Sequence, residues 1–147
     1  MDISTASISL FGEIKTTLDS CLSTIDEYSN TFKQEYFFTF SNPEQKFKIY
    51  ADEYRKFSAI FISYFDSLGS YATQISSLLL EADRNGDLEA ISPLKSAFEA
   101  YLLVEKSFYE YSKSVEKELS KNNPSISCLT LNLSKLKLSI CSFYEKL

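Results

Sequence analysis

The sequence predicts an all-α protein built from long antiparallel helices that pack along apolar stripes with a seven-residue repeat. Apolar residues recur at alternating steps of three and four along most of the chain, which is the spacing of one helix face. Three glycines and three prolines in 147 residues leave few turns. No segment has the strand–turn–strand pattern of a hairpin. This length fits one domain, and we expect residues 1–147 to form it.

The first helix is expected over about residues 4–40. Its stripe consists of Phe11, Ile14, Leu18, Cys21, Ile25, Tyr28 and Phe32. The repeat blurs in the aromatic cluster of residues 36–40. Across the whole chain, twelve Phe and ten Tyr residues with no Trp predict an aromatic core with Tyr hydroxyls at the edges of the helix contacts.

The second helix is expected over residues 43–84. Asn42 can cap it, Pro43 suits the first helical position, and Gln45 sits where a capping box needs it. The stripe runs through Phe47, Tyr50, Tyr54, Phe57, Phe61, Tyr64, Leu68, Tyr71, Ile75 and Leu78. A second row at Ala51, Phe65, Ala72 and Leu79 widens the apolar face. We therefore expect this helix to contact more than one neighbour. The wide part forms a candidate dimer or partner interface of Phe57, Phe61, Tyr64 and Phe65.

A third helix is expected over about residues 87–121 and a fourth over 125–147, with Asn122-Asn123-Pro124 between them. Asn85-Gly86 is a strong helix-stop signal, Asp87 can cap a new helix, and Ser92-Pro93 offers a second start. Residues 85–93 leave two architectures open. A sharp turn there would give a compact four-helix bundle, and a kink would give an extended rod.

The residue types argue against an enzyme. The chain has no histidine, and its glycines are isolated, so we expect no His-based catalysis, no zinc site, no phosphate loop and no cofactor. Residues 83–89 carry oxygen ligands around a glycine, but the spacing of a calcium loop is not met and Arg84 is basic. A capped turn is the favoured interpretation. Glu105 falls on the apolar stripe of the third helix, where we expect it to reach solvent or pair with a lysine.

The net charge of −5 opposes nucleic-acid binding, although residues 101–147 carry a small positive excess. If the last two helices are antiparallel, five lysines cluster near one end of the molecule. These candidate membrane-binding residues are Lys113, Lys117, Lys121, Lys135 and Lys137. Lysines near a surface attract anionic lipid headgroups. The alternative is an ordinary solvated face, because Glu110, Glu116 and Glu118 lie among them.

Cys21, Cys128 and Cys141 form no CxxC pair, which favours a reducing compartment. No apolar run approaches the length of a transmembrane helix, and the N-terminus lacks the features of a signal peptide. We therefore expect a cytoplasmic protein that is at most peripheral on membranes.

One long segment carries a family resemblance. Residues 78–121 read LLLEADRNGDLEAISPLKSAFEAYLLVEKSFYEYSKSVEKELSK. Before this segment the chain has a break at residues 41–43. Within it, Gly86-Asp87-Leu88 is followed by Lys, Phe and Tyr residues at helical spacing. In this order the chain resembles BAR domains, especially those of Arf GTPase-activating proteins and of proteins that pair a BAR with a PH domain.

The resemblance implies a crescent-shaped antiparallel homodimer that binds curved or anionic membranes with lysines at its tips. It also implies that the second and third segments are one long helix bent at residues 85–93. The fourth helix is short for that family. The sequence thus predicts a BAR-like membrane-association module. The alternative is a helical-bundle adaptor that binds only other proteins in a trafficking or cytoskeletal assembly.

Overall fold

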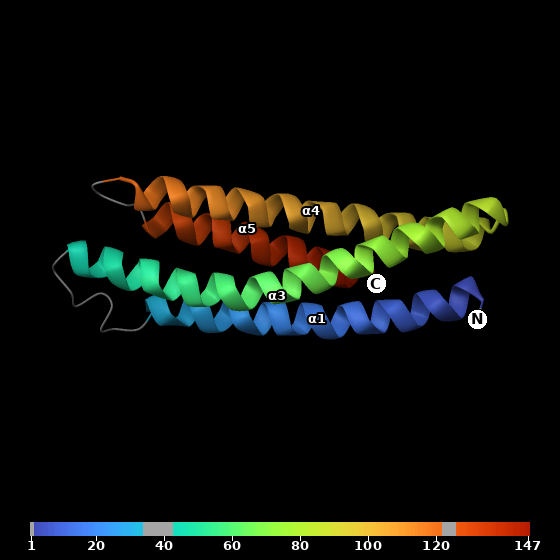
Figure 1. The fold of residues 1–147 in the computed structure, drawn as a ribbon, viewed down its shortest axis with the longest axis horizontal. Helices are drawn as coiled ribbons and strands as arrows, with labels where there is room; N and C mark the ends of the chain where they lie inside the picture. Colours follow the sequence, from blue (N-terminus) through green and yellow to red (C-terminus); the bar gives the residue numbers. More distant parts are fainter. Residues whose placement is uncertain (1, 34–42, 122–125) are drawn as a thin grey trace.

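A computed structural model describes residues 2–33, 43–121 and 126–147 (Figure 1). In these ranges the chain forms four helices and no strand, so the predicted all-α class is confirmed. The helices are α1 (Ile3–Lys33), α3 (Pro43–Arg84), α4 (Leu88–Leu119) and α5 (Ile126–Glu145). The bounds of α3 are those expected from the sequence. Residues 34–40 of the first expected helix, the Asn42 cap and the Asn122-Asn123-Pro124 turn lie outside the described residues.

The connection between α3 and α4 is a sharp turn rather than a kink. Gly86 adopts a φ of 66°, a conformation that glycine reaches without a Cβ clash. The Asp87 N–H donates to the Ala82 carbonyl at 2.9 Å and the Gly86 N–H donates to the Asp83 carbonyl at 3.2 Å. These two bonds close α3 with a Schellman motif. The Asp87 carboxylate accepts from the Ala90 N–H at 3.3 Å and so caps α4.

The second start signal, at Ser92-Pro93, is not used. Pro93 lies inside α4, in its second turn, where its missing N–H removes one intrahelical hydrogen bond. The segments that the BAR resemblance joins into one bent helix are therefore two helices in this structure, and they run in opposite directions (Figure 1).

The helices lie side by side, each antiparallel to the next along the chain (Figure 1). The most extensive packing joins α4 to α5, α1 to α3 and α3 to α4, and α1 also packs on α5. The shorter α5 ends part-way along the molecule, so α1, α3 and α4 alone form the end that holds the 85–87 turn (Figure 1). As expected, α3 contacts more than one neighbour.

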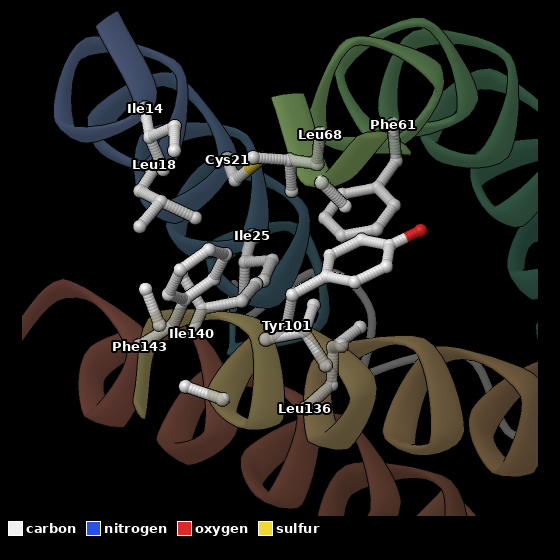
Figure 2. Packing of buried hydrophobic residues seen from close by; sticks show 14 of the residues in the cluster. Ile14, Leu18, Cys21, Ile25, Phe61, Leu68, Tyr101, Leu136, Ile140 and Phe143 are labelled. Atoms are coloured by element: carbon white, nitrogen blue, oxygen red, sulfur yellow. The ribbon is translucent and has the colours of Figure 1, made fainter. Parts of the chain in front are cut away.

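The apolar stripes meet in one continuous core. In Figure 2 the α1 side chains Ile14 and Leu18 lie on the side of Ile140 and Phe143 of α5, whereas Cys21 lies beside Leu68 of α3. All six are buried. The same core contains the α3 and α4 stripes, including Leu68, Ile75, Leu94 and Val104. Burial of these apolar surfaces is the main force that holds the helices together.

Candidate functional site

The predicted lysine cluster is divided over two sides of α5. Lys113 and Lys117 lie on α4, and Lys121 follows the end of that helix. Asn132 of α5 donates to the Ser114 hydroxyl of α4 at 2.9 Å. Lys137, in contrast, pairs with Asp26 of α1 at 2.6 Å. It therefore lies on the α1 side of α5, away from the α4 lysines.

Three of the five lysines already have acidic partners. Lys113 Nζ lies 3.8 Å from Glu116 and 5.4 Å from the centre of the Tyr109 ring. Lys121 Nζ lies 3.1 Å from Glu118. The hydrogen bond from Lys137 to Asp26 raises the pKa of that lysine. Such exposed pairs contribute little to stability, but each one reduces the positive charge available to a lipid headgroup.

The other two predicted lysines, Lys117 and Lys135, are exposed. Neither makes an ion pair within residues 2–33, 43–121 and 126–147. The free positive charge of the cluster is therefore smaller than the sequence suggests.

The predicted partner interface on α3 is largely inside the molecule. Phe57 and Phe61 are buried. Phe57 stacks on Tyr28 of α1 with ring centres 4.3 Å apart, and Phe61 stacks on Phe108 of α4 at 4.9 Å. Only Tyr64 and Phe65 of the predicted set are partly exposed. The wide face of α3 is thus occupied by α1 and α4 of the same chain.

Glu105 behaves as expected, because it is exposed. Its carboxylate accepts a hydrogen bond from the Tyr101 hydroxyl at 3.0 Å. Burial, and then this neighbouring carboxylate, raise the pKa of Tyr101 to about 12. The buried stripe of α4 passes through Val104 and Tyr111, so Glu105 lies beside this stripe and not on it, and its placement on the stripe was wrong.

Three tyrosine hydroxyls meet in the core, which the sequence reasoning missed by assigning Tyr hydroxyls to the edges of helix contacts. Tyr111 of α4 is hydrogen-bonded to Tyr28 of α1 at 2.9 Å and to Tyr50 of α3 at 3.1 Å. All three rings are buried. Burial raises the pKa of each hydroxyl. The available signal was that Tyr28 and Tyr50 occupy predicted stripe positions, but Tyr111 was not assigned to a stripe, and spacing alone does not say which side chains meet.

A shallow hollow of about 180 Å³ lies between α1 and α3. Its polar lining includes Glu27 and Glu53, and Lys56 pairs with Glu53 at 3.4 Å. Tyr28 and Phe57 line it as well, but both rings are buried. In the part of the chain that the structure describes, no three His, Cys, Asp or Glu side chains gather as metal ligands would.

Exposed apolar side chains gather on α4, another feature that the sequence reasoning missed. Leu102, Leu103 and Tyr109 are 45%, 56% and 62% exposed and lie within eight consecutive residues. They fall off the buried stripe, between charged residues such as Lys106 and Glu110. Contiguous exposed apolar patches mark sites of protein–protein contact, whereas single exposed apolar residues are ordinary on a protein surface.

No protein-family model, curated protein or solved structure matches this chain. None of the helices in residues 2–33, 43–121 and 126–147 is long and apolar enough to cross a membrane.

Proposed function

We propose that this chain is a non-enzymatic four-helix bundle that binds other protein chains through the exposed side of α4. The observation that carries the proposal is the group of Leu102, Leu103 and Tyr109, which are large, apolar and exposed while the core beneath them is complete. Apolar residues flanked by lysines and glutamates on one helix also occur where helices associate in coiled coils.

The turn at residues 85–87 supports the bundle in place of the BAR-like rod. It returns α4 along α3, and the aromatic rings of the two helices interlock at Phe61, Phe65 and Phe108. A rod would need these rings to face a second chain. Here they are covered within one chain, and the adaptor alternative therefore has the better structural support.

The test uses a photo-crosslinking amino acid at position 102, in the full chain expressed in cells. We expect covalent adducts with protein at this position. The matched control is position 138 on α5, where Leu138 is equally apolar and 68% exposed but lies on another helix. Absence of protein adducts at 102, or equal yields at 102 and 138, would contradict a binding surface on α4.

Binding to anionic membranes is a second candidate, supported by the exposed lysines of α4 and α5. Lys117 and Lys135 are exposed, and the pairs of Lys113 and Lys121 with nearby glutamates are open to water on the lysine side. Each lysine near an anionic surface contributes roughly 1 kcal/mol. Four such residues would give measurable, salt-sensitive adsorption.

The experiment for this candidate is sedimentation with vesicles that contain phosphatidylserine. Changing Lys113, Lys117, Lys121 and Lys135 to Glu should abolish binding. The control changes Arg55 and Lys56 on α3, which are also exposed and paired with local acids. If wild-type chain stays in the supernatant at low salt, membrane binding by these lysines is excluded.

A further inference from the structure

We propose that the outer face of α5 docks on an anionic lipid bilayer, with Leu131 and Leu138 entering the boundary between the headgroups and the acyl chains. This inference rests on the second candidate function, membrane binding through lysines, and adds to it a defined face and two apolar anchors. The outer face of α5 consists of Cys128, Leu131, Ser134, Lys135 and Leu138, all of which are exposed.

The packing of α5 leaves this face uncovered. The helix packs on α4 and on α1. Asn132 is hydrogen-bonded to α4 at 2.9 Å, and Lys137 is paired with α1 at 2.6 Å. With 3.6 residues per turn, Leu131 and Leu138 lie within about 20° of each other around the helix, and each is about 100° from Asn132 or Lys137. Both leucines therefore point away from the two neighbouring helices.

The two leucines are not needed for the core. A separate row on the opposite side of α5 is buried and fills the interior, namely Leu129, Leu133, Leu136, Ile140 and Phe143. Leu131 and Leu138 are 58% and 68% exposed. They stand seven residues apart, roughly 10 Å along the helix, with Lys135 between them. Leucines next to lysine on the outer side of a helix are the pattern of a helix that lies in a membrane interface.

The charge around the leucines favours an anionic surface over other occupants. Their helical neighbours three and four positions away include Lys135 and no acidic residue, and the single acid of α5 is Glu145 at its last position. On α4, in contrast, the exposed Leu102 has Glu99 and Glu105 as such neighbours. Carboxylates there would repel anionic headgroups, whereas Lys135 attracts them. Charge complementarity thus assigns the lipid surface to α5 and not to α4.

A lysine of α4 extends the positive charge of this face. Ser114 of α4 contacts Asn132 of α5, which fixes the level of the two antiparallel helices. Lys117 follows Ser114 by three residues, and Leu131 precedes Asn132 by one. At 1.5 Å per residue, Lys117 and Leu131 lie within about 3 Å of the same level. Lys117 and Lys135, both exposed, can therefore bind headgroups while the leucines lie deeper, as long lysine side chains permit.

The first test measures whether the face enters a bilayer. The chain contains no tryptophan, so Leu138→Trp in the purified full chain is the sole indole. We expect its fluorescence to shift to shorter wavelength, and to be quenched by brominated lipid, on vesicles of phosphatidylcholine with about 30% phosphatidylserine. Ile60→Trp on α3 is the matched control, because Ile60 is 50% exposed but lies on another helix. Its emission should not change.

The second test measures what the leucines contribute. Changing Leu131 and Leu138 together to Ser should lower the partition of the chain onto these vesicles at least tenfold in a sedimentation assay, because two apolar side chains no longer leave water. The same change at Ile60 and Ile62, which are 50% and 46% exposed on α3, should alter the partition by less than about twofold. Circular dichroism of each variant confirms that the helices are retained.

Three results would overturn the inference. These are an unshifted Leu138→Trp emission, an equal shift on vesicles of phosphatidylcholine alone, and equal losses for the two serine pairs. Self-association of the lipid-free chain that the α5 serine pair abolishes would assign the face to a second copy and would overturn it as well. A chain that adsorbs through its lysines with an unshifted tryptophan would keep the second candidate function and reject only the insertion of α5. A chain that never leaves the supernatant would reject both.

Discussion

The two halves of the core obey the same helical repeat but are built from different residues. The half near the start of α3 is aromatic and contains Tyr28, Tyr50, Phe57, Phe61 and Tyr111. The fully buried residues of the half near the 85–87 turn are aliphatic, and several of them are small alanines. This half contains Ile14, Ala72, Ile75, Ala82, Leu94 and Ala97.

The difference lies in how strictly each half fixes the alignment of its helices. Aliphatic side chains of similar volume exchange with little loss as long as the core stays filled. A buried hydroxyl, in contrast, must meet a partner at about 2.8 Å, and leaving it unpaired is costly. The tyrosine hydroxyls join α1, α3 and α4 at one level. We infer that the aromatic half sets the register and that the aliphatic half follows it.

The largest expected effect comes from removing a ring in the aromatic half. Phe61→Ala leaves a cavity between Phe57, Phe65 and Phe108, whose ring centres lie 5.2, 6.4 and 4.9 Å away. We expect a loss of about 3–5 kcal/mol in the free energy of unfolding, measured by urea denaturation. Leu94→Ala in the aliphatic half should cost less, since it breaks no ring pairs. A larger loss for Leu94→Ala would remove the distinction between the halves.

The next effect isolates the hydroxyl group. Tyr111→Phe keeps the ring and removes the hydrogen bonds to Tyr28 and Tyr50, so we expect a loss of about 1–3 kcal/mol. Tyr109→Phe, on an exposed ring, is the control and should change the free energy of unfolding by less than about 0.5 kcal/mol. Equal and small effects in the two variants would mean that the buried hydroxyls do not contribute to register.

Alkaline pH should destabilise the protein through the same tyrosines. Their pKa values are raised in the folded state by burial, whereas tyrosines of the unfolded chain ionise near pH 10. Above about pH 10 the unfolded state therefore binds fewer protons, and stability falls as pH rises. Each such group contributes at most about 1.4 kcal/mol per pH unit.

The measurement is denaturation at pH 8 and pH 11, before and after Tyr111→Phe. The variant has one raised pKa fewer, so its stability should fall less steeply with pH. Parallel pH profiles would show that ionisation of Tyr111 is not coupled to unfolding. The Cys21 thiol, whose pKa burial raises to about 12, adds a similar loss to both proteins and cancels in the comparison.

The smallest effects concern the turn that closes the aliphatic half. Gly86→Ala places a Cβ on a residue with a φ of 66° and should cost about 1–2 kcal/mol. Gly12→Ala, in α1 with no atom within 4 Å of the new Cβ, should instead stabilise by about 0.5–1 kcal/mol. Thermal unfolding of both variants shows whether each substitution lowers or raises the stability. If Gly86→Ala is neutral, the 85–87 turn does not depend on this glycine conformation.

Local signals in the sequence predicted much of the fold. The spacing of apolar residues identified the helices and most of the buried positions of α1, α3 and α5, but on α4 it missed Ala97, Val104 and Tyr111. Pro43, Asn85-Gly86 and Asp87 marked where α3 begins, where it ends and where α4 starts. These features depend on residues only a few positions apart, and backbone sterics and capping decide them without help from the rest of the chain.

The predictions of functional sites were less accurate, because the exposure of a side chain depends on which other helix covers it. The aromatic residues of α3 formed a plausible outer interface in the sequence, yet α1 and α4 bury Phe57 and Phe61. Lys137 was grouped with the α4 lysines by its position in the chain, yet its partner is Asp26, 111 residues away. Leu102 and Tyr109 attracted no notice, since they lie outside every stripe.

By itself the sequence determined the helical class, the bounds of α3 and the break at residues 85–87, since each of these follows from short-range spacing and capping. Only the tertiary structure decided that the chain turns sharply enough to cover its own aromatic face, that three tyrosine hydroxyls meet, and that α4 keeps an exposed apolar surface. Those outcomes depend on contacts across separations of 61 and 83 residues. A helical repeat shows which face of a helix is apolar, but it does not show which other helix will pack against that face.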